Sequence, residues 1–113
     1  MKLMIVDDNK GVRTLIRSLF ENRAEQIIEC SDGQSAVEQY DRHIPDYVLM
    51  DIEMKRMDGF EATRKIIEKH PGAKIIIVTS HANYKFYEIS KQAGATEFVS
   101  KENLFELEEI IRV

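Results

Sequence analysis

Apolar residues follow two kinds of pattern along this chain, short continuous runs and sets spaced three or four residues apart. Such runs lie in residues 3–6, 26–30, 46–50, 74–78 and 96–100, unbroken in 3–6 but interrupted by polar residues in 26–30 and 96–100. Short runs rich in β-branched residues, bounded by turn residues, are typical of strands buried on both faces. The sequence therefore predicts five strands.

The spaced sets predict a helix after each strand, because a three-to-four spacing places apolar side chains on one helix face. The first helix is predicted to begin after Asp8 or Asn9, since either side chain can cap it. The predicted inward residues, in chain order, are Val12, Leu15, Ile16, Leu19 and Phe20; Ala36, Val37 and Tyr40; Ala62 or Thr63, Ile66 and Ile67; Phe86, Ile89, Ser90 and Ala93; and Leu104, Leu107, Ile110 and Ile111.

Breaks between the predicted elements fall at residues that end helices. Pro45 closes the second helix, His70-Pro71-Gly72 the third, and Gly94 fits the position just past the fourth. Strands that alternate with helices form a parallel sheet covered on both faces, with right-handed crossovers. With 113 residues and no linker or low-complexity segment, the chain is expected to be one α/β domain over residues 1–113.

Composition and charge exclude several classes of function. Sixteen basic and twenty acidic residues are interspersed and give a net charge of −4, which disfavours binding to nucleic acid or to an anionic membrane surface. No run of residues is long and apolar enough for a signal peptide or a spanning helix, so we expect a cytoplasmic protein without membrane contact. The single Cys30 is interpreted as a core residue.

Polar residues with useful chemistry follow four of the predicted strands. Asp7 and Asp8 follow the first strand, Asp51 the third, Thr79 the fourth and Lys101 the fifth. Ligands of open parallel sheets bind beyond the carboxyl ends of the strands, so these side chains are expected to meet at one edge. Taken singly, each aspartate is as well explained by a turn or a helix cap.

Three carboxylates at one edge repel one another unless a cation lies among them. Mg²⁺ prefers oxygen ligands and commonly combines carboxylates with phosphate oxygens, so the cluster favours phosphoryl chemistry. In that chemistry Asp51 would be the nucleophile that forms an acyl phosphate, while Lys101 and Thr79 would contact the phosphoryl oxygens.

With these residues, the chain resembles the receiver domains of two-component response regulators. The resemblance rests on five blocks in the same order: residues 4–9 (MIVDDN), 49–61 (LMDIEM followed by MDGFE), 77–80 (IVTS), 93–95 (AGA) and 98–101 (FVSK).

The resemblance implies a flavodoxin-like (βα)5 doubly wound sheet with strand order 2-1-3-4-5. It also implies transfer of a phosphoryl group to Asp51 from a histidine kinase, a phosphotransfer protein or a small phosphodonor. Asp8, Asp51 and the backbone carbonyl of Glu53 match the direct ligands of Mg²⁺ in this family, and Asp7 matches a ligand that acts through water.

The same resemblance assigns roles in switching. Lys101 would pair with the phosphoryl group, Thr79 would move to hydrogen-bond it, and Phe98 would swing inward. The alternative for Phe98 is an ordinary core residue. The last helix, the fifth strand and the helix after Thr79 would form the face that signals to a downstream protein or output domain.

Two residues depart from the family pattern. Glu102 stands where a proline commonly follows the lysine, so a trans peptide bond is expected there. Lys55 replaces a frequent proline after Asp51, which should leave that loop less restrained.

Three surface features suggest further hypotheses. Tyr84, Tyr87 and Lys91 form an outward stripe that suits a partner, or are half-buried residues of an amphipathic helix. Arg13 and Arg17 lie beside the acidic site and either assist kinase docking or form a solvated helix face. Glu53 and His81 border the expected phosphoryl position and are hypothesised to tune the lifetime of the phosphorylated form.

The leading hypothesis is a phosphorylation-dependent switch that acts on itself alone and is not an enzyme with an external substrate. The alternative is a Mg²⁺-dependent phosphatase of the haloacid dehalogenase type, but that family spaces its two aspartates two residues apart, whereas Asp7 and Asp8 are adjacent. A nucleotide- or flavin-binding module is weaker still, because no glycine-rich loop follows the first strand.

Overall fold

Five parallel strands form one sheet in the order β2-β1-β3-β4-β5 in the computed structural model, which describes residues 1–112. The strands are β1 (Lys2–Val6), β2 (Gln26–Cys30), β3 (Tyr47–Met50), β4 (Ile75–Thr79) and β5 (Glu97–Ser100). The predicted fold class and strand order are confirmed. Because the strand order reverses between β1 and β3, the carboxyl ends of these two strands flank the crevice where such sheets bind ligands.

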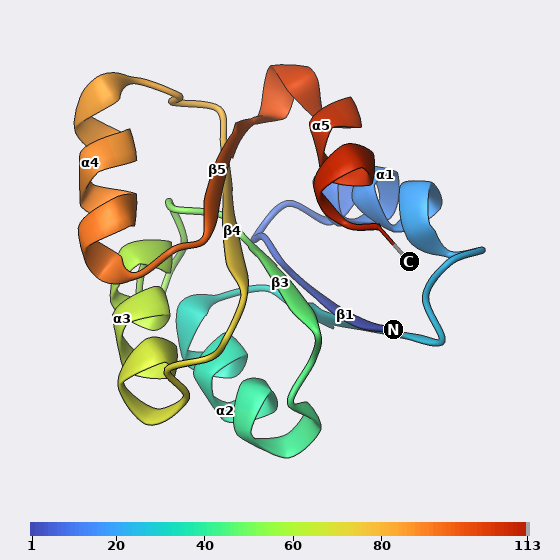
Figure 1. Ribbon diagram of the computed structural model, residues 1–113, viewed down its shortest axis with the longest axis horizontal. Helices are drawn as coiled ribbons and strands as arrows, with labels where there is room; N and C mark the ends of the chain where they lie inside the picture. The colour runs from blue at the N-terminus through green and yellow to red at the C-terminus, as the bar shows by residue number, and fades with distance from the viewer. Residues whose placement is uncertain (113) are drawn as a thin grey trace.

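Helices cover both faces of the sheet (Figure 1). They are α1 (Lys10–Phe20), α2 (Gly33–His43), α3 (Gly59–Lys69), α4 (Tyr84–Ala93) and α5 (Phe105–Ile110), with a short 3-10 helix at Lys101–Asn103. In Figure 1, α2, α3 and α4 lie on one side of the sheet, and α1 and α5 lie on the other. Among residues 1–112 no helix is long and apolar enough to span a membrane.

The central strands are buried on both faces, which explains their continuous apolar sequences. Along β1, Met4 and Val6 join the core under α2, α3 and α4, whereas Leu3 and Ile5 join the core under α1 and α5. Alternate residues of a strand point to opposite faces, so a strand covered on both sides needs apolar residues at every position.

Helix starts follow one rule in four of the five helices. An Asn or Asp side chain just before the helix accepts a hydrogen bond from the backbone N–H three residues further on. The capping residues are Asn9, Asp32, Asp58 and Asn83. Asn9 rather than Asp8 therefore caps α1, which leaves the Asp8 side chain available for other chemistry, and Gly94 ends α4 as predicted, with a φ of 100°.

Two details of the predicted helices were wrong or incomplete. Leu15 was predicted to face inward but is 53% exposed, because the buried stripe of α1 centres on Ile16 and Phe20 and is narrower than its apolar pattern. The last helix begins at Phe105, a residue that is 77% exposed, one residue later than its apolar stripe suggests. The predicted domain ends at Val113, which lies outside the described residues.

Candidate functional site

The pairing of β1 with β3 brings two buried carboxylates side by side. Val6 lies opposite Met50 in the parallel register, so Asp7 and Asp51 leave the sheet at neighbouring positions. The backbone N–H of Asp51 donates to the carbonyl of Val6 at 2.9 Å. Asp7 is 2% exposed and Asp51 is 6% exposed, whereas Asp8 is exposed at the same edge. The predicted meeting of these aspartates is confirmed.

Lys101 reaches both buried carboxylates from the end of β5. Its Nζ lies 2.8 Å from Oδ2 of Asp7 and 3.2 Å from Oδ1 of Asp51. An ammonium in this position offsets part of the charge that burial makes costly. The sequence-based expectation that Lys101 would face the aspartates across the sheet edge is therefore met.

The three aspartates form a group that suits a hard cation. One carboxylate oxygen from each of Asp7, Asp8 and Asp51 lies within 4.8 Å of the others. Three carboxylates face a single ammonium, so negative charge is left to be neutralised. All the candidate ligands are oxygen atoms, the type that Mg²⁺ prefers, and the residues present therefore fit a divalent cation of this kind.

The electrostatic surroundings shift the pKa of two groups at the site. Burial, and after it the charge of Asp7, raises the pKa of Asp51 to about 6 from its ordinary 3.8, and Lys101 opposes this rise. Burial alone would lower the pKa of Lys101, but its hydrogen bond to Asp7 and the charges of Asp51 and Asp7 outweigh burial and raise it. The ammonium form of Lys101 is thus favoured beside the carboxylates.

Thr79 is the last residue of β4 and is 1% exposed. In the sheet register it lies opposite Ser100, the residue that precedes Lys101. Its Oγ accepts a hydrogen bond from the backbone N–H of His81 at 3.0 Å. Thr79 therefore stands at the start of the loop that leads into α4, in contact with the backbone of that loop.

Phe98 is half-buried and meets α4 through an aromatic contact. Its ring packs edge-on against Tyr87, with ring centroids 5.7 Å apart, and it borders the core under α2, α3 and α4. Lys91 Nζ lies 5.8 Å from the centroid of Tyr87, and the neighbouring Tyr84 is 76% exposed. The predicted outward stripe on α4 is thus exposed, and Phe98 lies directly behind it.

Sequence reasoning missed the contacts that fix the loop after Asp51. Arg56 and Met57 both have positive φ values, 58° and 123°, which side chains rarely adopt. The Met57 carbonyl accepts a hydrogen bond from the Gly33 N–H at 3.1 Å, and Arg56 Nη2 lies 2.9 Å from Oδ2 of Asp32. No local sequence pattern signals these contacts, because the partners lie in a different turn.

Gly59 fixes the far end of the same loop. Its N–H donates to the carbonyl of Ile52 at 2.8 Å, and a Cβ at this position would lie 1.8 Å from the backbone oxygen of Asp51. Only glycine allows α3 to start this close to the candidate nucleophile. The looser loop expected from Lys55 stays a prediction, although these tethers supply restraint that a proline would otherwise give.

Two exposed residues meet above the site. His81 Nε2 lies 2.8 Å from Oε1 of Glu53, with both side chains more than half exposed. The sequence predicted that both would border the phosphoryl position, and the structure joins them as a pair.

All peptide bonds among the described residues are trans. The prediction of a trans bond between Lys101 and Glu102 is therefore confirmed.

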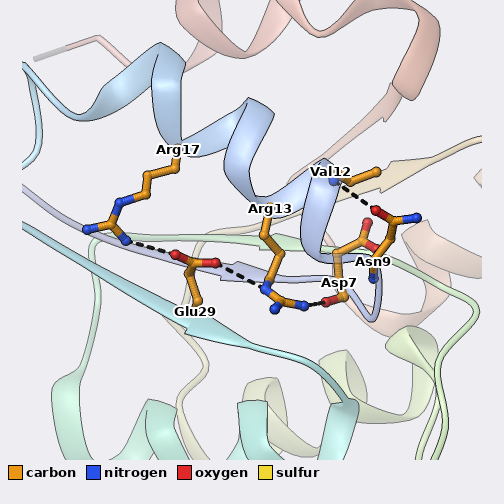
Figure 2. A network of polar contacts seen from close by, with 6 residues as sticks. All are labelled: Asp7, Asn9, Val12, Arg13, Arg17 and Glu29. Carbon is orange, nitrogen blue, oxygen red and sulfur yellow. Dashed lines mark hydrogen bonds and ion pairs between the residues drawn. The ribbon is translucent and has the colours of Figure 1, made fainter.

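Arg13 and Arg17 lie on α1 and both contact Glu29 of β2 (Figure 2). The Arg13 side chain is only 16% exposed, so it is not part of a solvated helix face, whereas the Arg17 side chain is 42% exposed and stays consistent with that interpretation. Arg13 also reaches the backbone of Asp7.

Comparisons with known proteins agree with this geometry. The sequence profile of the family described as "Response regulator receiver domain" matches residues 3–112. The chain is 38% identical over 100 residues to the chemotaxis protein CheY of Halobacterium salinarum, covering 88% of this chain and 83% of that protein.

Solved structures give the same result. The response regulator domain of Thermotoga maritima CheB superposes with a TM-score of 0.87 at 25% identity, covering 97% of this chain and 92% of that one. CheY in the CheX-CheY-BeF3-Mg²⁺ complex from Borrelia burgdorferi superposes with a TM-score of 0.85 at 25% identity, covering 99% and 90%.

Proposed function

Since this chain belongs to the response regulator receiver domain family, whose members are phosphorylation-dependent signalling switches, we propose that Asp51 is its phosphoacceptor. The observation that carries the proposal is the position of Asp51, buried at the end of β3 within reach of Lys101 and beside two further aspartates. The phosphatase alternative has no observation in its favour, since the adjacent Asp7 and Asp8 and the strand order both follow the receiver pattern.

Four groups would hold a magnesium ion at this site. Asp8, Asp51 and the backbone carbonyl of Glu53 are proposed as direct ligands, and Asp7 as a ligand through water. When bound, Mg²⁺ would neutralise charge on the carboxylates and on the phosphoryl oxygens. The support for this assignment is the close set of carboxylate oxygens of Asp7, Asp8 and Asp51.

The proposed reaction is an in-line transfer to a carboxylate oxygen of Asp51. That oxygen forms a bond to phosphorus while the bond from phosphorus to the donor breaks. The electron pair of the broken bond leaves with the donor. The donor is the phosphohistidine of a histidine kinase or phosphotransfer protein, or a small acyl phosphate. Asp51 must be ionised to attack, and above pH 6 its pKa allows this.

Lys101 and Thr79 are proposed to bind the new phosphoryl oxygens. The ammonium of Lys101 lies next to Asp51 and needs little movement. The Thr79 hydroxyl would turn toward the phosphoryl group and release the His81 N–H that it holds. Because His81 belongs to the loop before α4, this exchange would connect phosphorylation to α4.

Phe98 is proposed as the second moving part. Its ring lies between the core and Tyr87, so an inward movement would change the surface of α4, β5 and α5. That surface is proposed to contact a downstream protein or output domain. We propose that the chain works in the cytoplasm and catalyses only its own phosphorylation and dephosphorylation.

Incubation with acetyl phosphate and Mg²⁺ tests this function. The parent chain should gain one phosphoryl group that hydroxylamine removes, as expected for an acyl phosphate, and Asp51→Asn should gain none. Thr79→Ala is the matched control, because it changes a buried site residue but leaves the nucleophile in place and should still be labelled. A parent chain that stays unlabelled with Mg²⁺ would rule out the proposed function.

A further inference from the structure

Arg13 is a partly buried cation that contacts the backbone of the acidic site. Its side chain is 16% exposed, and its Nη1 donates to the backbone carbonyl of Asp7 at 2.7 Å. Its Nε donates to Oε1 of Glu29 at 3.0 Å (Figure 2). One guanidinium therefore joins α1, β2 and the end of β1.

Glu29 fixes the direction of the Arg13 side chain. It lies on β2 opposite Ile5 of β1, close to the point where β1 ends. Its second oxygen, Oε2, accepts from Nη1 of Arg17 at 2.9 Å. Figure 2 shows Glu29 between the two arginines, with only Arg13 reaching on to Asp7.

The carbonyl that Arg13 holds belongs to the peptide unit between Asp7 and Asp8. The other polar groups of Asp7 are also bound: its N–H donates to the Cys30 carbonyl at 3.1 Å, and Oδ1 accepts from the Asn9 N–H at 2.9 Å. Asp8 is exposed, and within residues 1–112 no hydrogen bond or ion pair holds its side chain, so the backbone that leads to it sets the direction of its Cα–Cβ bond. The contact from Arg13 thus fixes the plane from which Asp8 extends toward the cation site.

The guanidinium is suited to this task by its shape. It presents several N–H donors in a rigid plane, so Nε and Nη1 can bind two acceptors at once, whereas a lysine ammonium is a compact charge on a flexible stem. Hydrogen bonds from a charged donor are also stronger than neutral ones. Groups that orient metal ligands from outside contribute strongly to metal affinity.

We propose that Arg13 is a positioning residue for the divalent cation. Through the Asp7 carbonyl it holds Asp8 in the direction needed for binding, and Glu29 holds Arg13 in turn. This inference rests on the proposed function in so far as the cation serves phosphorylation of Asp51. Arg13 thereby increases the affinity for Mg²⁺ although it is itself positively charged.

Because Arg13 is positively charged, the loss of its charge and the loss of its positioning contact should change the affinity for Mg²⁺ in opposite directions. Removing a cation near three carboxylates should, through charge alone, strengthen the binding of Mg²⁺. Removing a positioning contact should weaken it. Arg13→Met therefore separates the two effects, because it deletes the charge and the hydrogen bonds but retains an unbranched apolar stem.

Arg17→Met is the matched control. Arg17 contacts the same Glu29 from the same helix but does not reach Asp7 in the part of the chain that the structure describes. Both variants lose an ion pair to Glu29 and one positive charge. A role limited to packing α1 on β2 would give both variants the same effect on Mg²⁺ binding.

Mg²⁺ affinity is to be measured by titration of the ¹⁵N-labelled chain, following backbone amide resonances, with unfolding in urea recorded in EDTA as a separate readout. We expect Arg13→Met to bind Mg²⁺ about tenfold more weakly than the parent. Arg17→Met should match the parent within about twofold. The Asp8 amide resonance, which belongs to the peptide unit held by Arg13, should shift in Arg13→Met but not in Arg17→Met.

Arg13→Lys completes the experiment. Arg13→Lys keeps the charge and should still weaken Mg²⁺ binding, and it replaces Arg13→Met if that variant does not fold. Unchanged or tighter binding in both Arg13 variants, or an equal loss in Arg17→Met, would overturn the inference. If the parent binds Mg²⁺ but is not phosphorylated, the proposed function fails while the inference about Arg13 is still decided by the titration.

Discussion

The two sides of Asp51 are held in different ways. On one side, which we call the anchored side, residues 7–9 and 51–58 are tied by backbone contacts to β1, β2 and the start of α2. On the other, the responsive side, the Thr79 hydroxyl holds a backbone N–H of the next loop, and the partly exposed ring of Tyr87 packs against Phe98. Cation binding needs fixed oxygen atoms, whereas a signal needs groups that can change partners.

On the anchored side, close backbone contacts and one ion pair hold the loop after Asp51 in place. Gly33 and Gly59 allow backbone to approach backbone, and Arg56 contacts Asp32 beside a strained stretch of loop. Strained backbone persists only where its surroundings hold it in place. Each of these contacts on the responsive side involves at least one side chain, which can rearrange by rotation without breaking the sheet.

The largest expected effect comes from breaking the anchored side with Gly59→Ala. The added Cβ would lie 1.8 Å from the backbone oxygen of Asp51, so β3 and α3 would have to move apart. We expect a loss of about 3 kcal/mol or more in the free energy of unfolding, measured in urea. Gly72→Ala is the control, because no atom lies within 4 Å of its Cβ position, and it should change stability little. Equal stability of the two variants would contradict the close approach.

A second prediction concerns the charge that the anchored side carries. The pKa of Asp51 is raised to about 6 from 3.8, so the folded chain holds this proton more tightly than the unfolded chain. The stabilisation that this gives is complete below pH 4 and is lost as pH rises through about 6. In EDTA, Asp51→Asn should therefore be more stable than the parent at pH 8, by about 2 kcal/mol, with the difference shrinking toward pH 5. A less stable Asp51→Asn at pH 8 would show that the Lys101 pair outweighs burial.

Thr79→Ala tests the responsive side with a smaller effect on stability. Loss of the hydrogen bond to the His81 N–H should cost about 1 kcal/mol. Phosphorylation of Asp51 should persist, but the amide shifts that it causes in α4 and β5 of the parent should largely disappear. If these shifts survive in Thr79→Ala, the hydroxyl is not the connection between the phosphoryl group and α4.

The smallest effect on stability is expected from the pair above the site. Glu53 and His81 are both more than half exposed, so breaking their contact should change the free energy of unfolding by less than about 1 kcal/mol. Their hypothesised role predicts instead that Glu53→Ala and His81→Ala change the rate at which phosphate is lost. Lifetimes of the phosphorylated form equal to that of the parent in both variants would show that the pair does not tune this lifetime.

Sequence patterns predicted the sheet well because a strand buried on both faces is apolar at almost every position. The run before Asp51 is apolar at every position, and its end marks the site without reference to other elements. Leu15 was misplaced because spacing gives the direction of a buried stripe but not its width, which depends on how α1 lies on the sheet.

The tethers of the site could not be predicted in the same way. Arg13 and Glu29 are 16 residues apart, and Arg56 and Asp32 are 24 apart, so only the folded chain brings them together. The positive φ values of Arg56 and Met57 could not be predicted from the sequence either, because neither residue type favours them. Chemistry placed at strand ends is visible in the sequence, whereas the contacts that orient it depend on tertiary structure.

Locating the phosphoryl group decides whether Asp51 is the phosphoacceptor. After labelling with acetyl phosphate and Mg²⁺, cleavage after Arg42 and Lys55 releases residues 43–55, which contain Asp51 as the only site carboxylate among Asp7, Asp8 and Asp51. We predict that mass spectrometry finds the phosphoryl group on this peptide, that EDTA prevents its appearance and that Asp51→Asn lacks it. A phosphoryl group on another peptide, or equal labelling of Asp51→Asn, would show that Asp51 is not the phosphoacceptor.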